Sequence, residues 1–226
     1  MARTRIYSLL LILLCLPLCI QAQKGNAKSI GKNQTEWIVC KFLDKTKDSV
    51  RVLGNPQIVP SKFGKAVLFD GLKDAIFINQ MPLAGLEQFT VEAIFRPDDG
   101  GKFEQRFFHC GEIKGSRVMM ELRSTPKGWY FDAFLNANDS KKTLADSTLL
   151  HPSNQWYHVA FVVDKGKLTT YVNGEKELQE NIPMTPFFKG MTSLGVRQNE
   201  LSWFKGAIYK IRITPKALTP DLFIRK

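Results

Sequence analysis

Hydrophobic and polar residues alternate over short stretches of this chain, and turn-forming residues separate the stretches. Between residues 158 and 163, for example, every second residue is a large hydrophobe: Val159, Phe161 and Val163. A period of two residues is typical of a β-strand, and no stretch sustains the period of 3.6 residues that indicates a helix. Gly, Pro, Asn or Asp occupies almost every gap. The pattern predicts an all-β fold with strands at 36–43, 66–69, 75–79, 89–96, 105–110, 117–123, 129–136, 156–163, 168–172, 192–196 and 206–213.

Two hairpins stand out in this pattern. The stretches 156–163 and 168–172 are joined by a four-residue turn, Asp-Lys-Gly-Lys, and a second tight turn follows at Asn173-Gly174. The stretches 117–123 and 129–136 flank a turn-rich loop at 124–128. Because successive strand residues point to opposite faces, alternation assigns one set of side chains in the second hairpin to the core. That set is Val118, Met120, Leu122, Trp129, Phe131, Ala133 and Leu135.

Four segments carry a resemblance to a known family. They read K-F-G-K-A-V-L-F-D-G at 62–71, F-T-V-E-A-I-F-R-P at 89–97, W-Y-H-V-A-F-V-V-D-K-G-K-L-T-T-Y-V-N-G at 156–174, and F-K-G-A-I with a later A-L-T between 204 and 219. In this order they resemble the laminin-G-like, concanavalin A-like jelly-roll domains of secreted proteins. The resemblance implies a two-sheet antiparallel jelly-roll sandwich, in one domain spanning residues 36–226. This fold hosts lectins, glycosidases, lyases and adhesion modules, so it does not by itself give the activity.

In the resembled fold one sheet curves into a groove, and ligands lie in the groove or at the loops on its rim. The outward face of the hairpin 117–136 is mixed polar and aromatic. If this hairpin belongs to the curved sheet, five of its side chains line the groove: Glu121, Arg123, Tyr130, Asp132 and Asn136.

Glu121 and Asp132 are the best carboxylate pair for an enzyme in this sequence. Retaining glycosidases hold two carboxyl groups about 5–5.5 Å apart, and these two residues lie on facing strands. Laminarinase-type members of the fold carry a compact E-x-D-x-x-E strand, which this sequence lacks. The alternative reading is an exposed cross-strand charge pattern that includes Arg123. A polysaccharide lyase would need a base near an arginine, for which His109, Arg106, Arg123 and Tyr130 are available.

Sugar recognition uses an aromatic ring surrounded by planar polar groups, because one face of a pyranose is apolar while its hydroxyls need hydrogen bonds. Trp203 follows a polar loop that contains Arg197 and Asn199, and this is the most lectin-like local cluster. With Arg123, Tyr130 and Asn136, these three residues form the predicted ligand-binding set. The competing reading is that Trp203 folds over the edge of the sandwich.

Calcium is the one cofactor that the resemblance raises, since many relatives bind one ion. Tyr209 and Lys210 stand where the family's closing strand commonly has an acidic pair, which argues against a site there. Asp70 and Asp74 remain as weak candidate ligands, although turns explain the first of them adequately.

The chain is basic, with 32 Lys plus Arg against 21 Asp plus Glu and a formal net charge of +11. Basic domains attract polyanions, and an acidic polysaccharide is the best-motivated partner of this kind. A solvated surface that keeps the protein in solution is the other reading. The lysines are scattered, and no basic stripe is interleaved with aromatic residues, so nucleic acid is not an expected partner.

Residues 1–22 have the form of a secretory signal peptide, with a basic start, an apolar run at 6–20 and Ala22 before the cleavage point. That run is shorter than the ~20 residues of a membrane span. We therefore expect a secreted or periplasmic protein with no membrane span, and a flexible polar leader at 23–35. Cys40 and Cys110 remain after cleavage, either as a disulfide or as two separate buried thiols.

The sequence therefore predicts a noncatalytic, lectin-like domain that binds glycans or a glycosylated surface. A glycoside hydrolase or polysaccharide lyase of the same fold, and a laminin-G-type protein-interaction module, are the alternatives.

Overall fold

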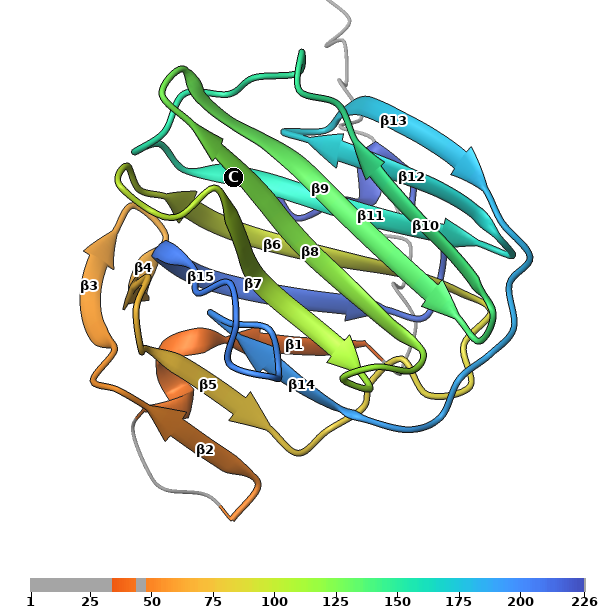
Figure 1. Ribbon diagram of the computed structural model, residues 1–226, viewed down its shortest axis with the longest axis horizontal. Coiled ribbons are helices and arrows are strands. Elements are labelled where there is room, and N and C mark those ends of the chain that lie inside the picture. Colours follow the sequence, from red (N-terminus) through yellow and green to blue (C-terminus); the bar gives the residue numbers. More distant parts are fainter. Residues whose placement is uncertain (1–33, 44–47, 226) are drawn as a thin grey trace, which may run out of the picture.

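The strands of the protein form two antiparallel sheets that pack face to face (Figure 1). The computed structural model describes residues 34–43 and 48–225. The predicted signal peptide and most of the predicted leader lie outside these residues, and the leader's last residue, Thr35, already begins the first strand. Mostly β structure in two antiparallel sheets confirms the predicted sandwich.

One sheet has eight strands in the order β13-β12-β11-β6-β15-β4-β3, with β1 pairing with the same edge of β15 as β4. Its members are β1 (Thr35–Ile38), β3 (Gln57–Ser61), β4 (Gly64–Asp70), β6 (Gln88–Pro97), β11 (Tyr157–Asp164), β12 (Lys167–Val172), β13 (Glu175–Asn181) and β15 (Lys205–Thr214).

The other sheet has seven strands in the order β10-β9-β8-β7-β14-β5-β2. Its members are β2 (Val50–Leu53), β5 (Ala75–Ile78), β7 (Glu104–Gly111), β8 (Arg117–Thr125), β9 (Gly128–Ala137), β10 (Ser140–Ala145) and β14 (Met191–Leu194). Two short 3-10 helices complete the described secondary structure, η1 (Val39–Phe42) and η2 (Pro220–Leu222).

The core between the sheets is rich in aromatic rings. Phe95 of β6 stacks on Phe107 of β7 with ring centroids 4.4 Å apart, and it meets Trp129 of β9 edge-on at 5.3 Å. Such pairs add about 0.5–1.5 kcal/mol beyond the burial of their surface. The core residues predicted for the hairpin 117–136 are all buried, which confirms which face of β8 and β9 points inward.

The first predicted strand, 36–43, is wrong in its second half. Strand β1 ends at Ile38, and η1 follows it. Four strands were not predicted at all, and they are the outermost strands of the two sheets: β13 and β3 in one, β10 and β2 in the other. Edge strands bury little surface and often carry charges that discourage pairing with other chains. The sequence of β13, Glu-Lys-Glu-Leu-Gln-Glu-Asn, illustrates why alternation does not reveal them.

Cys40 and Cys110 are both buried and both free, so the structure has separate thiols rather than a disulfide between them. Cys110 points into the core, where its sulfur lies 3.4 Å from that of Met81. Burial raises the pKa of the Cys110 thiol to about 12, which makes it an inert packing group.

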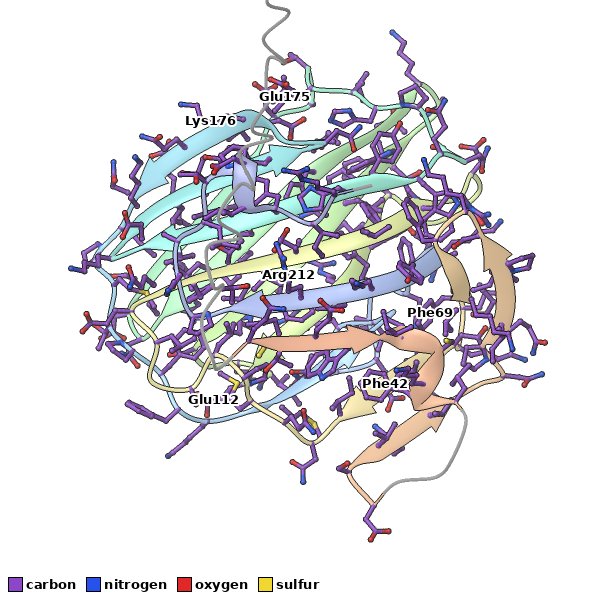
Figure 2. All side chains as sticks on the ribbon, turned by 180° about the vertical axis from the view of Figure 1, so that it is seen from behind. Phe42, Phe69, Glu112, Glu175, Lys176 and Arg212 are labelled. Atoms are coloured by element: carbon purple, nitrogen blue, oxygen red, sulfur yellow. The ribbon has the colours of Figure 1, made fainter. Side chains whose placement is uncertain are left out.

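The segment after β15 crosses the outer face of the eight-stranded sheet. Its Leu218 and Phe223 pack on Ala160 and Val162 of β11. Figure 2 looks onto this face and shows Arg212 near its middle. No helix in the part of the chain that the structure describes has the length and hydropathy of a membrane span.

Candidate functional site

The outer face of the seven-stranded sheet carries most of the residues that the sequence singled out. Antiparallel pairing of β8 with β9 sets Glu121 opposite Asp132, and Arg123 opposite Tyr130. The same register sets Asn136 opposite Arg117. All of these side chains lie on one face, because strand residues two apart share a face.

Glu121 and Asp132 form the centre of an ionic cluster with two arginines. Arg106 Nε lies 2.9 Å from Glu121 Oε2, and Arg123 Nη2 lies 2.6 Å from Asp132 Oδ2. Glu104, whose side chain is 50% exposed, caps the cluster through Arg106 Nη1 at 2.7 Å and Arg123 Nη1 at 3.3 Å. The cluster therefore joins β7, β8 and β9 across the face of the sheet.

The expectation that these charges are exposed is wrong. Glu121 is 2% exposed and Asp132 is 1% exposed, because the long side chains of Arg106 and Arg123 lie over them. Asp132 Oδ1 is buried without a hydrogen-bond partner among the described residues. Arginine stems can cover neighbouring groups in this way while their guanidinium ends pair with carboxylates.

Burial raises the pKa of Glu121 to about 7. Arg106 opposes the rise, and the neighbouring Asp132 carboxylate adds to it. Burial also raises the pKa of Asp132, against the effect of Arg123 and Arg106. Glu121 can hence hold a proton near neutral pH, but neither carboxyl group is exposed enough to touch a substrate in this conformation.

Next to the cluster lies an open depression of about 440 Å³, lined by Arg117, Phe134, Lys141, Lys142 and Thr143. The Arg117 guanidinium carbon lies 4.8 Å from the centroid of the Phe134 ring. Thr143 is the cross-strand partner of Phe134 on β10. The depression therefore combines an aromatic ring, a planar cation, a hydroxyl and the ammonium group of Lys141, whereas the ammonium group of Lys142 pairs with Glu180 at 3.2 Å.

Sequence reasoning found only part of this depression. Alternation placed Arg117 and Phe134 on the correct face, but neither entered the predicted ligand-binding set. Lys141 and Thr143 were missed because β10 was not recognised as a strand. The adjacent lysines at 141 and 142 were the available signal, since two charges at a sheet edge are typical of an exposed strand.

The loop between β14 and β15, residues 195–204, lies across the same face over β14 and β7, as Figure 1 shows in blue. Ser202 binds Arg106 through its backbone carbonyl and its hydroxyl. Gln198 donates from its backbone to His109 Nδ1 at 3.2 Å. The loop is thus fixed to β7 by hydrogen bonds.

Within this loop, the three predicted ligand-binding residues have different environments. Trp203 is partly buried against Phe77 of β5 and Val196, so it packs over the sandwich. Arg197 donates to the carbonyl of Ile113 at 3.3 Å, and Asn199 is exposed.

The structure does not bring Trp203 and Tyr130 together. Strand β5 is four strands away from β9 in the sheet order, which corresponds to roughly 19 Å at the usual strand spacing. Tyr130 and Trp203 therefore lie on opposite halves of the face.

Asp70 and Asp74, the weak calcium candidates, are occupied by backbone N–H groups. Asp70 Oδ1 accepts hydrogen bonds from the N–H groups of Leu72, Lys73 and Asp74. The Asp74 carboxylate accepts from the N–H groups of Asn55 and Asp70. Burial alone would raise the pKa of Asp70, but these backbone bonds hold it below its usual value. Residues 34–43 and 48–225 contain no group of three or more His, Cys, Asp or Glu placed to hold a metal ion.

A sequence model of the concanavalin A-like lectin/glucanases superfamily matches residues 70–222, which is more than half of the chain. The chain belongs to this superfamily. The match covers β5 to η2 and therefore includes the whole hairpin of β8 and β9. No curated protein matches the sequence significantly.

Several solved structures resemble this chain in fold. Domain 4 of an extracellular arabinanase from Geobacillus stearothermophilus, in complex with arabinotriose, has 24% identity and a TM-score of 0.57, covering 74% of this chain and 79% of that one. A heptameric pentraxin from Limulus polyphemus has 19% identity and a TM-score of 0.56, covering 69% and 77%. The binding domain of botulinum neurotoxin DC, in complex with SialylT, has 14% identity and a TM-score of 0.58. The match covers 76% of this chain and 44% of the toxin chain.

Proposed function

We propose that this protein is an exported, noncatalytic carbohydrate-binding domain whose ligand lies on the outer face of the seven-stranded sheet. The observation that carries the proposal is the open depression around Phe134 and Arg117, beside a carboxylate pair that arginines cover. The face thus offers groups that bind a sugar, while its best candidate acids are shielded from a substrate.

The chemistry of the depression suits a saccharide. The partly exposed ring of Phe134 can pack against the apolar face of a pyranose. Arg117 and Lys141 can donate hydrogen bonds to sugar oxygens, and the Thr143 hydroxyl can donate or accept. Two structural neighbours, the arabinanase domain and the neurotoxin binding domain, were solved with arabinotriose and with SialylT. Their ligands support a sugar-binding role by analogy of fold.

The first experiment is a glycan-array screen of the chain from Gln23 onward, run with calcium and again with a chelator. Selective glycan binding that survives the chelator is the expected result, because Asp70 and Asp74 are already occupied by backbone N–H groups. Binding that disappears with the chelator would require a calcium site that these residues do not provide. Silence across the array would contradict the proposal and favour a protein-interaction module.

Replacing Phe134 with alanine is expected to weaken binding of the best array ligand about fivefold, since an aromatic platform contributes about 1 kcal/mol. Isothermal titration calorimetry measures the change. The matched control is Phe188→Ala, which removes a ring that is 69% exposed and does not line the depression. Equal weakening of binding in both variants would show that the ligand does not bind in the depression.

One observation favours a glycoside hydrolase as a second candidate. A carboxyl group with a pKa of about 7, as Glu121 has, can act as a general acid at neutral pH. The noncatalytic proposal expects no release of reducing sugar from any array ligand, by the wild type or by Glu121→Gln. Turnover by the wild type that is lost in Glu121→Gln and Asp132→Asn, with both variants folded, would establish the enzyme instead.

A further inference from the structure

We infer that the ligand of this face is an acidic glycan, and that Arg117 and Arg197 bind its carboxylate or sulfate group. This inference rests on the proposed carbohydrate-binding function and specifies the class of sugar. It follows from the pairing of charges on the face, which leaves two of its arginines without a carboxylate.

Every carboxylate of the ionic cluster is already bound to Arg106 or Arg123. Glu104 contacts both arginines, at 2.7 and 3.3 Å. Glu121 contacts Arg106 at 2.9 Å, and Asp132 contacts Arg123 at 2.6 Å. The ion pairs of these three carboxylates are therefore all made with Arg106 and Arg123.

Arg117 and Arg197 form no ion pair with any residue of the described part of the chain. Arg117 Nη1 donates to the carbonyl of Gly115 at 2.7 Å, and Arg197 Nη2 donates to the carbonyl of Ile113 at 3.3 Å. Both arginines hence attach to the same short turn between β7 and β8. The Nε atom of each is buried without a hydrogen-bond partner among the described residues.

The positive charge of Arg117 and Arg197 shifts the pKa values of neighbouring groups. Burial and the charges of Arg117, Arg197 and Arg106 together lower the pKa of His109 to about 4, against a hydrogen bond to the Glu112 carbonyl. Burial and the charges of Arg197 and Arg106 also lower the pKa of Arg117 itself, against the effect of the nearby Glu121 carboxylate. His109 is consequently neutral at physiological pH, and an added anion would relieve the repulsion between the arginines.

The position of Arg117 connects this charge to the sugar surface. Arg117 lines the depression and lies over the Phe134 ring, so one ligand can contact both groups. Lys114 and Lys141 are exposed beside the two ends of this region. An acidic sugar can therefore place its ring beside Phe134, one face of which Arg117 covers, and its oxyanion on the arginines, which bind carboxylate and sulfate oxygens strongly through charge-assisted hydrogen bonds.

The test measures binding of three polysaccharides by calorimetry: polygalacturonate as a carboxylate, dextran sulfate as a sulfate ester, and dextran as a neutral sugar. Wild-type protein is expected to bind at least one acidic polymer and to bind dextran at least tenfold more weakly. Arg117→Gln and Arg197→Gln are each expected to weaken acidic-polymer binding about tenfold. The two acidic polymers show which oxyanion the site prefers.

Arg51→Gln is the matched control, because it removes the same charge from β2 at the far edge of the same sheet. Unchanged binding in this control shows that net charge alone is not responsible. Arg117→Lys keeps the charge and loses the planar fork, so weakened binding in this variant indicates a guanidinium–oxyanion contact rather than a fold defect. Thermal unfolding of each variant identifies any that fails to fold.

The outcomes separate the inference from the function on which it rests. Binding of dextran as tight as binding of both acidic polymers, or equal losses in Arg51→Gln and Arg117→Gln, would overturn the acidic-glycan inference and leave carbohydrate binding intact. Single-stranded DNA is the fourth probe of the test, and binding to it as tight as that of the acidic polymers would overturn the inference in favour of a nucleic acid. Absence of binding to any saccharide would overturn both.

Discussion

Replacing Glu92 with leucine is expected to lower the free energy of unfolding by about 3–5 kcal/mol, because it leaves the buried Arg212 guanidinium without its carboxylate partner. Glu92 is 0% exposed. Its carboxylate lies 2.5 Å from Arg212 Nε and 2.9 Å from His158 Nε2. It also accepts a hydrogen bond of 2.7 Å from the backbone N–H of Ile224, which holds the end of the chain on the sheet. Urea denaturation followed by tryptophan fluorescence measures the loss.

The matched control is Glu36→Gln, which removes a carboxylate from an ion pair with Lys210 at 2.9 Å near the surface. An exposed pair of this kind is worth about 0–1 kcal/mol. Hydrogen exchange provides a second readout: in Glu92→Leu the amides of residues 217–225 should lose protection before those of β6 and β11. A loss no greater than that of Glu36→Gln would contradict the assignment of Glu92 as the anchor of the C-terminal segment.

Alternation in the sequence predicted the hairpin of β8 and β9 down to the face of each side chain. The reason is physical, since a shift of one residue would move Trp129 and Leu135 out of the core. Burial of the hydrophobic set therefore specifies the register that places Glu121 opposite Asp132.

The burial of those two carboxylates could not be predicted in the same way. It depends on Arg106, which reaches the outer face beside Glu121, and on an irregularity in β7. The pairing of β7 with β8 shifts between Arg106 and Phe108, so Phe107 and Phe108 both join the core. Strict alternation would instead put Phe107 and His109 on one face. A β-bulge reverses which residues of a strand face the core, and no glycine or other turn-forming residue among residues 106–108 indicates its position.

Strands that are hydrophobic at every position, rather than at every second one, indicate that both faces of the sheet are covered there. Strand β5 reads Ala-Ile-Phe-Ile and is buried at every position. A strand that is hydrophobic on both faces must be covered on both. On the outer face of β5 the cover is the loop that contains Trp203, which explains why this tryptophan packs on Phe77 rather than standing open to a ligand. The continuous apolar run in β11 has the same explanation, since Leu218 and Phe223 cover it.

The wild-type protein is expected to lose stability relative to Glu121→Gln as the pH rises from about 4.5 to about 7. The pKa of Glu121 is raised from 4.5 to about 7 in the folded protein. In this range the unfolded chain releases the proton that the folded protein retains, so the raised pKa costs stability as the pH increases. At about 1.4 kcal/mol per pH unit, the loss for Glu121 is about 3 kcal/mol. Denaturation in urea between pH 4.5 and pH 8 measures it.

Two neighbouring groups also shape the measured profile. Burial raises the pKa of Asp132, so Asp132 acts in the same direction. The pKa of His109 is lowered from 6.5 to about 4, and its contribution has the opposite sign, because stability is lost as the pH falls through this range. Both groups remain in Glu121→Gln, and the difference between the two profiles reports Glu121 together with its coupling to the neighbouring Asp132.

Above pH 7 the variant is expected to be at least as stable as the wild type, which distinguishes this prediction from an ordinary loss of a salt bridge. Arg106 keeps Glu104 as a partner at 2.7 Å when Glu121 is neutral, so the substitution leaves no buried cation unpaired. The matched control is Glu104→Gln, since hydrogen bonding to Arg106 lowers the pKa of Glu104, and its removal should not flatten the profile. A Glu121→Gln protein that is less stable than the wild type at pH 8 would show that the ionised carboxylate is favourable where it lies. The arginines would then outweigh burial, and Glu121 would carry a full negative charge beside the proposed glycan site.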